Sequence, residues 1–144
     1  MRDKDGMMQF ELIEHTADIG VRSFGATIAE AFETAAAGMF SLLADPGQIC
    51  DQQEFPVEVE AEDRETLLVE WLNELLYIYE SRGVLLKRFH IREISDTRLL
   101  GSAYGEPIDP GRHEIRTDIK AVTYYQLRVK QRKSGWLTEV IFDV

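Results

Sequence analysis

The alternation of apolar and polar residues predicts two strands near the start of the chain. Phe10 and Leu12 alternate with polar residues, and Ile19 and Val21 resume the same period after a short polar segment. A period of two is typical of a strand with one buried face. The segment from Glu14 to Gly20 is therefore predicted to join two strands.

Two longer stretches have the period of amphipathic helices. Apolar residues recur at helical spacing from about 28 to 43, directly after Thr27, which begins a capping box. A broader apolar stripe covers 67–79, with Asp63 as its candidate cap, and the pattern ends at 81–83. We expect two main helices, of which the second supplies the largest block of core. The acidic residues on its other face favour a solvated surface.

The rest of the chain predicts further strands. Short alternating runs occupy residues 55–61, 85–92, 99–103, 120–129 and 136–144. Asp96 and Thr97 form the turn of a predicted hairpin, and odd positions form the drier face of 120–129, which gives Tyr125 a packing role. Residues 105–111, with two prolines, predict a loop, and His113 beyond it has no evident partner.

Composition and charge narrow the class of protein. A chain of 144 residues with 44% hydrophobic content predicts one domain over residues 8–144, after a loose leader over residues 1–7. The 16 Lys and Arg against 26 Asp and Glu give a net charge of -10, so no strong direct nucleic-acid binding is expected. Cys50 is the single cysteine, and no stretch is apolar enough for a membrane span or a signal core. We expect a cytoplasmic protein that does not bind membranes.

The first segment with candidate chemistry lies between the two N-terminal strands. Asp18 has a short side chain that accepts several hydrogen bonds or binds a hard cation, and Gly20 lets backbones approach closely. His15 adds a titratable group to the same segment. A structural role remains open from these residues alone, because Asp-x-Gly is common at turns and a lone histidine is often a hydrogen-bonded structural residue.

The last third of the chain carries the second candidate. The strand predicted over 120–129 begins with Lys120, and the last strand ends with Asp143 and Val144. If Val144 is the terminus, its carboxylate and that of Asp143 supply anionic oxygens that suit Ca²⁺ or Mg²⁺ once Asp18 approaches them. A simpler alternative for Lys120 is a surface ion pair with a nearby acid.

Four blocks of residues together resemble the archease family. They are His15-Thr16-Ala17-Asp18-Ile19-Gly20, Trp71-Leu72-Asn73-Glu74-Leu75-Leu76-Tyr77, Lys120-Ala121-Val122-Thr123-Tyr124 and Ile141-Phe142-Asp143-Val144. The resemblance spans about residues 8 to 144. It implies an α/β (α+β) fold, in which a mixed, largely antiparallel sheet and two main helices form a two-layer sandwich with a strand-helix-strand-strand module.

The same resemblance implies a function and a set of site residues. It implies a non-catalytic protein cofactor that activates the RtcB-type RNA ligase of tRNA splicing by promoting guanylylation and multiple turnover of the ligase. The implied metal ligands are Asp18, Asp143 and Val144, with Ca²⁺ as the expected divalent cation. Lys120 is expected to join Asp18 and Asp143 in ligase activation. Tyr125 departs from the pattern, because many relatives have His there, and this departure weakens the case for acid-base catalysis by the protein itself.

Two other classes of function remain open. A metal-dependent hydrolase would use Asp18, Asp143 and His15 around a cation-activated water, but it needs an open coordination position and a substrate cleft. A chaperone-like interaction module would use the acidic face of the second helix and would need no metal. Turnover by the protein alone favours the hydrolase, whereas function that survives neutralisation of both aspartates favours the interaction module.

Overall fold

The computed structural model describes residues 9–14 and 18–144. The predicted leader over residues 1–7 and the candidate residue His15 lie outside the described residues. None of the helices in the described part of the chain is both long and apolar enough to cross a membrane.

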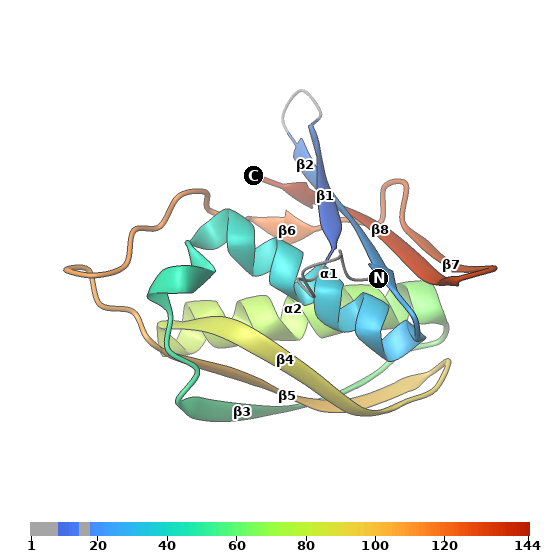
Figure 1. Cartoon of the computed structure of the whole chain (residues 1–144), viewed down its shortest axis with the longest axis horizontal. Helices are drawn as coiled ribbons and strands as arrows, with labels where there is room; N and C mark the ends of the chain where they lie inside the picture. The colour runs from blue at the N-terminus through green and yellow to red at the C-terminus, as the bar shows by residue number, and fades with distance from the viewer. Residues whose placement is uncertain (1–8, 15–17) are drawn as a thin grey trace.

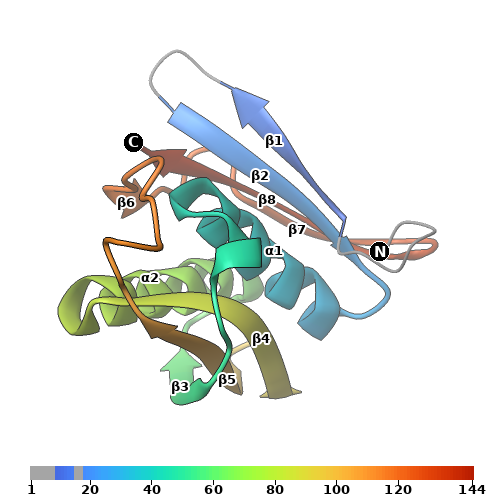
Figure 2. The ribbon, with the colours of Figure 1, turned by 60° about the vertical axis from the view of Figure 1, so that its left-hand side comes forward.

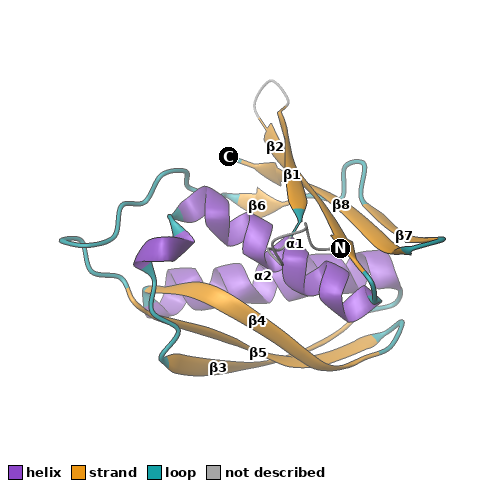
Figure 3. Ribbon diagram, in the orientation of Figure 1, coloured by secondary structure: helices purple, strands orange, loops and turns teal. Residues whose placement is uncertain are grey.

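The chain forms two helices between two antiparallel sheets (Figures 1 and 3). The larger sheet contains β1 (Phe10–Glu14), β2 (Asp18–Gly25), β6 (Ala121–Val122), β7 (Arg128–Arg132) and β8 (Gly135–Asp143), in the order β1-β2-β8-β6, with β7 also paired to β8. The smaller sheet contains β3 (Gln53–Glu60), β4 (Val84–Ile94) and β5 (Arg98–Pro107), in the order β3-β5-β4. Helices α1 (Ile28–Leu43) and α2 (Arg64–Arg82) lie between these sheets (Figure 2), and a 3-10 helix (Pro46–Gln48) follows α1.

The α+β class with two main helices is confirmed, but the arrangement of strands differs from the expectation. Every strand pairing in the described part of the chain is antiparallel, and the strands divide into two sheets. The expectation of a single mixed sheet that forms a two-layer sandwich with the helices is therefore wrong. The physical reason lies in the helices, which bury most of their circumference. Helix α1 buries Phe32, Met39 and Leu43 completely, and a helix that is apolar nearly all round needs cover on two sides.

Local signals set the ends of α1 as the sequence predicts. The hydroxyl of Thr27 accepts a hydrogen bond from the backbone N–H of Glu30 at 3.1 Å, which satisfies one free donor of the first turn. Gly38 lies against the larger sheet, where a methyl group in its place would come within 2.7 Å of Cγ1 of Val21. The glycine therefore lets α1 approach the larger sheet closely.

Helix α2 also has the predicted ends and supplies much of the core. Asp63 accepts a hydrogen bond from the backbone N–H of Thr66 at 2.8 Å, and Gly83 ends the helix in the left-handed conformation with φ 63°. Trp71 is completely buried and donates its indole N–H to the carbonyl of Phe32 at 3.0 Å. This bond fixes α2 against α1.

The strand predicted over 120–129 is interrupted. Only Ala121–Val122 and Arg128–Arg132 pair with β8, and a turn separates them. In this turn Gln126 has φ 52°, a left-handed conformation that ends a strand. Tyr125 is consequently 60% exposed, and the predicted packing role for it is wrong.

The predicted hairpin of the smaller sheet is confirmed, and the predicted loop after it begins later than expected. Strands β4 and β5 pair from Val84↔Pro107 to Ile94↔Leu99, so residues 105 to 107 belong to β5 rather than to a loop. Gly105 allows this extension, because a side chain there would lie 1.8 Å from the carbonyl oxygen of Leu85. The two β4 and β5 backbones therefore pass too closely for any other residue.

Candidate functional site

The fold brings together the two acids that the sequence singled out from opposite ends of the chain. Asp18 begins β2 and Asp143 ends β8, and the two residues are direct partners in the antiparallel register. Directly opposite residues of an antiparallel pair point to the same face, with Cβ atoms about 4.5–5.5 Å apart. The two carboxylates are thus neighbours on one face at the end of the larger sheet.

Gly20 and Ile141 hold the register that places these acids opposite each other. They are paired residues one step further along the same face, and a methyl group at Gly20 would lie 2.7 Å from Cδ1 of Ile141. The buried Ile141 side chain, which is 1% exposed, occupies the space that the glycine leaves free. A slip of one residue would move Ile141 to the other face, so this contact opposes any misalignment of the acids.

The charge pattern along this face differs sharply between two rows, which the Gly20–Ile141 pair separates. In one row Arg22 donates to Glu11 on one side and to Glu139 on the other, both at 3.0 Å, so its guanidinium lies between two acids. These hydrogen bonds raise the pKa of Arg22. In the row of Asp18 and Asp143, no ion pair within residues 9–14 and 18–144 neutralises either carboxylate. Like charges directly opposite each other in a sheet are destabilising.

Lys120 and Val144 lie beside Asp143. The backbone N–H of Lys120 donates to the carbonyl of Asp143 at 2.8 Å, and the next residue, Ala121, is paired with Asp143 across β6 and β8. The side chain of Lys120 is exposed and makes no ion pair with an acid in the described part of the chain. Val144 is partly buried and packs against the core. Lys120, Asp143 and Val144, which the sequence predicted as site residues, therefore lie together where β6 begins and β8 ends.

The donors at this sheet end fit a hard divalent cation. Two facing carboxylates supply the oxygen ligands that Ca²⁺ and Mg²⁺ prefer, and they lack the sulfur and imidazole ligands that soft metals prefer. Among the described residues no group of three or more His, Cys, Asp or Glu side chains has the geometry to hold a metal ion. A cation bound here would therefore take further ligands from main-chain oxygens such as those of Val144 or from water.

A second polar cluster, around Glu106 and the loop after β5, was not predicted from the sequence. The carboxylate of Glu106 accepts two hydrogen bonds from Arg112, at 2.9 and 2.7 Å, and one from the backbone N–H of Cys50 at 2.8 Å. These donors lower the pKa of Glu106 to about 2. His113 accepts from the backbone N–H of Asp109 at Nδ1 and therefore carries its proton at Nε2, 3.0 Å from Glu106. The cluster fixes the loop after β5, and every polar group in it is used by its neighbours.

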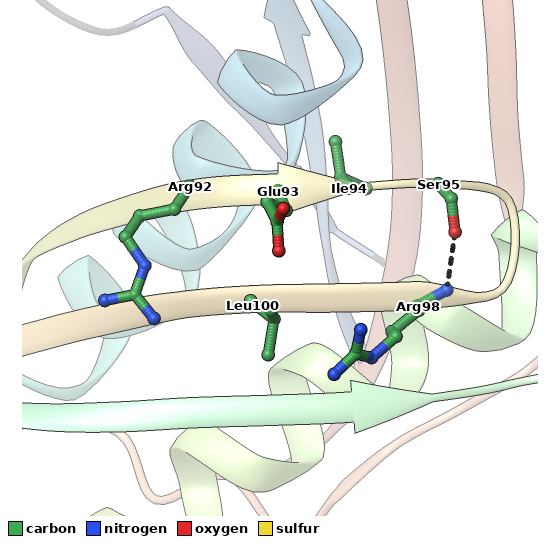
Figure 4. Close-up of a pocket in the computed structure, with 6 residues that line it drawn as sticks. All are labelled: Arg92, Glu93, Ile94, Ser95, Arg98 and Leu100. Atoms are coloured by element: carbon green, nitrogen blue, oxygen red, sulfur yellow. Dashed lines mark hydrogen bonds between the residues drawn. The ribbon is translucent and has the colours of Figure 1, made fainter.

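A hollow of about 520 Å³ lies on the smaller sheet (Figure 4), whereas the two acids lie on the larger one. Its lining residues belong to the β4–β5 hairpin: Arg92, Glu93, Ile94, Ser95, Arg98 and Leu100. Arg98 is already paired with Glu58 at 3.0 Å, and the hydroxyl of Ser95 accepts from the backbone N–H of Arg98. The hollow contains no arrangement of a nucleophile and a base, and none of the predicted site residues lines it.

Fold and site together define a small α+β protein with two facing carboxylates, of the kind that suits a hard cation, at the end of its larger sheet. Residues 10–144 match the model of the archease protein family (MTH1598/TM1083), and the chain belongs to that family. It is 39% identical over 142 residues to the protein archease of Pyrococcus furiosus, covering 96% of this chain and 100% of that protein. It is 38% identical over 140 residues to the protein archease of Methanosarcina mazei, covering 94% and 96% of the two chains.

Solved structures agree with this family membership. The solution structure of Methanobacterium thermoautotrophicum protein 1598 matches with a TM-score of 0.81 and 37% identity, and it covers 94% of this chain and 98% of that one. The crystal structure of an archease from Thermotoga maritima, described as a possible chaperone, matches with a TM-score of 0.62 and 25% identity, over 93% and 96% of the two chains. The α+β fold inferred from the sequence resemblance is thereby confirmed.

Proposed function

We propose that this chain is a non-catalytic protein cofactor that activates an RtcB-type tRNA-splicing RNA ligase in the cytoplasm. It would promote guanylylation of the ligase and so support multiple turnover. One observation carries the proposal beyond family membership. Asp18 and Asp143 are held directly opposite each other by the register of β2 and β8, with no cationic partner among the described residues.

The proposed cation site consists of Asp18, Asp143 and an oxygen of Val144. A bound Ca²⁺ would supply concentrated positive charge at this sheet end and remove the repulsion between the two carboxylates. The register of β2 and β8 supports this proposal, because it fixes the backbones of both aspartates opposite each other before any ligand arrives.

Lys120 gives the proposed site its link to phosphate chemistry. Its ammonium group is exposed and unpaired within the described residues, and its backbone is bonded to Asp143 at 2.8 Å. On a protein of net charge -10, this is a local positive group that can stabilise phosphate charge in the active site of a partner or orient ligands there. Lys120 and the two acids would then act as one unit.

The geometry supports an accessory role better than a hydrolytic one. A metal-dependent hydrolase needs a substrate cleft at its acids and an open coordination position. The hollow of Figure 4 lies on the smaller sheet, whereas the two acids lie on the larger one. A chaperone-like module would depend on the acidic face of α2 and would leave the facing aspartates without a role.

Multiple-turnover ligation tests the proposed function. A catalytic amount of ligase with GTP, divalent cation and RNA bearing a 3′-phosphate or a cyclic phosphate is followed with and without this protein. We expect product beyond one turnover only with the protein, and loss of that stimulation with Asp143→Asn. Glu114→Gln is the matched control, because it removes one exposed carboxylate that no described residue pairs with.

Three results would overturn the proposal. Equal turnover with and without the protein would remove its role as an activator. Stimulation that survives neutralisation of both Asp18 and Asp143 would favour the interaction module instead. Phosphate release by the protein alone, without ligase, would favour the hydrolase.

A further inference from the structure

Positive charge is concentrated in one stretch of this acidic chain. Residues 119–138 contain no Asp or Glu, although the whole chain has 26 of them and a net charge of -10. The cations within the stretch are Lys120, Arg128, Lys130, Arg132 and Lys133. Because the acids lie elsewhere in the sequence, the net charge of the protein conceals a local surface of the opposite sign.

Strand β7 displays most of these cations in a regular row. Val129 is 7% exposed and is paired with the fully buried Thr138, so this pair faces the core. The neighbouring positions 128, 130 and 132 therefore point to the outer face of the larger sheet, and successive members are about 6.6 Å apart along the strand. Lys133 follows in the turn to β8. Arg128, Lys130, Arg132 and Lys133 form what we call the basic strip.

The charges of the basic strip are available to a partner. All four side chains belong to exposed residues, and none of them makes an ion pair within the described part of the chain. The acid opposite Arg128 is Glu139, whose carboxylate already accepts from Arg22 at 3.0 Å. Elsewhere on the surface Arg64, Arg88 and Arg98 each have an acid within 3.0 Å. The strip therefore differs from these arginines in that its cations are unpaired and lie next to one another along one strand and its turn.

Aromatic side chains lie at both ends of the basic strip. Tyr124 and Tyr125, in the turn before β7, are each 60% exposed. Thr123 anchors this turn to β8, because its backbone N–H and its hydroxyl both donate to the carbonyl of Ile141, at 3.0 and 2.8 Å. At the other end a pocket of about 170 Å³ is lined by Arg132 and by two aromatic side chains, Phe24 and Trp136, and the guanidinium of Arg64 already lies over the Trp136 ring at 5.0 Å. Aromatic surfaces beside a cation row favour stacking with bases.

We propose that the basic strip, with the tyrosine turn and the pocket at its ends, binds an extended single strand of RNA. The cations would contact successive phosphates along β7, and the aromatic side chains would stack with bases. Alternate side chains of a β-strand are spaced about as far apart as successive phosphates of an extended RNA strand. An acidic protein partner would account for the cations but not for the aromatic side chains beside them. The surface includes neither Asp18 nor Asp143, so RNA binding here does not depend on the proposed activation of the ligase.

The small number of cations makes this a local contact of modest strength. Single-stranded binding falls with salt by about 0.7 in logarithmic slope for each phosphate neutralised, so three or four contacts give a slope of about -2 to -3. This contact is compatible with the expectation of no strong nucleic-acid binding from the net charge of -10. The net charge is an average over the whole chain, whereas the cations of the basic strip are segregated from the acids along β7 and its turn.

Fluorescence anisotropy with a labelled oligouridine of about 12 nucleotides tests the proposal at several salt concentrations. We expect saturable binding at low salt with the stated slope. The triple variant Arg128→Ala, Lys130→Ala, Arg132→Ala should bind at least about tenfold more weakly and lose most of the slope. The control triple variant Arg82→Ala, Lys87→Ala, Arg92→Ala has the same net charge, but its changes lie in α2 and β4. It should bind as the wild type does.

Three results would overturn the assignment. Equal binding by the wild type and the strip variant would remove the strip from the contact, provided that urea denaturation shows both to be folded. Equal affinity for the oligouridine and for a duplex of the same length would exclude a single-strand site. Displacement of the RNA by a polyglutamate peptide at equal charge concentration would show that an acidic protein, rather than RNA, is the partner.

Discussion

Replacing Asp143 by Asn should stabilise the protein without a divalent cation and destabilise it with one. Asn keeps nearly the same shape, so the change removes charge and little else. Asp143 directly faces Asp18 in the register of β2 and β8, and like charges at such positions cost about 0.2–1 kcal/mol. In chelator the variant should therefore exceed the wild type in unfolding free energy by this amount, or by about 1–4 °C in Tm.

Added Ca²⁺ should reverse the order of the two proteins. A cation that binds only the folded state stabilises it by about 2.7 kcal/mol at one hundred times its Kd. The wild type should gain this amount, whereas the variant, with one carboxylate fewer at the site, should gain little. The expected difference is then about 2 kcal/mol in favour of the wild type.

Urea denaturation in chelator and in excess Ca²⁺ measures both differences. Glu114→Gln serves as the control, because it makes the same change in net charge at an exposed position and should respond to Ca²⁺ as the wild type does. An equal gain from Ca²⁺ in the wild type and in Asp143→Asn would refute the reasoning, because it would place the cation elsewhere or show only general screening.

Three further predictions concern the chain end, the core and the loop after β5. A tag appended after Val144 should impair ligase activation, whereas the same tag before residue 1 should not, and equal stimulation by both would exclude any role of Val144 that depends on a free carboxylate end. Trp71→Ala should lower the unfolding free energy by about 3–5 kcal/mol in urea denaturation, because Trp71 is fully buried and bonded to Phe32; a loss below about 1 kcal/mol would contradict its core role. The pKa of Glu106 is lowered from 4.5 to about 2, so its contribution to stability is present above about pH 4.5 and is lost as the pH falls toward 2. Urea midpoints between pH 5 and pH 2 should therefore fall less steeply for Glu106→Gln, and an unchanged acid limb would exclude this linkage.

The helices could be predicted from the sequence because their signals are local. Thr27 and Asp63 cap the helices within three residues, and Gly83 ends the second one. The facing aspartates were identified as candidates by residue type and by resemblance. Their exact pairing depends on β2 meeting β8, which joins the two ends of the chain, and alternation alone does not specify which strands pair.

The break between β6 and β7 and the cluster around Glu106 could not be predicted, because no local sequence pattern indicates either of them. Gln126 adopts φ 52°, although neither Gly nor Asn marks the turn, so the break between β6 and β7 was missed and Tyr125 was misplaced. The partners of Glu106 come from Cys50 and from the loop that contains Arg112 and His113. Such a cluster forms only when distant segments pack, and no spacing in the sequence reveals it.

The rate of guanylate capture by the ligase tests the central claim most directly. With labelled GTP and a limiting amount of ligase, the wild-type protein should accelerate formation of the ligase-guanylate intermediate. Lys120→Ala and Asp143→Asn should each lose the acceleration, and the double variant should lose little more, because residues that act as one unit are not additive. Lys87→Ala, an exposed lysine of β4, should accelerate the step as the wild type does. Full acceleration by folded Lys120→Ala would contradict the claim.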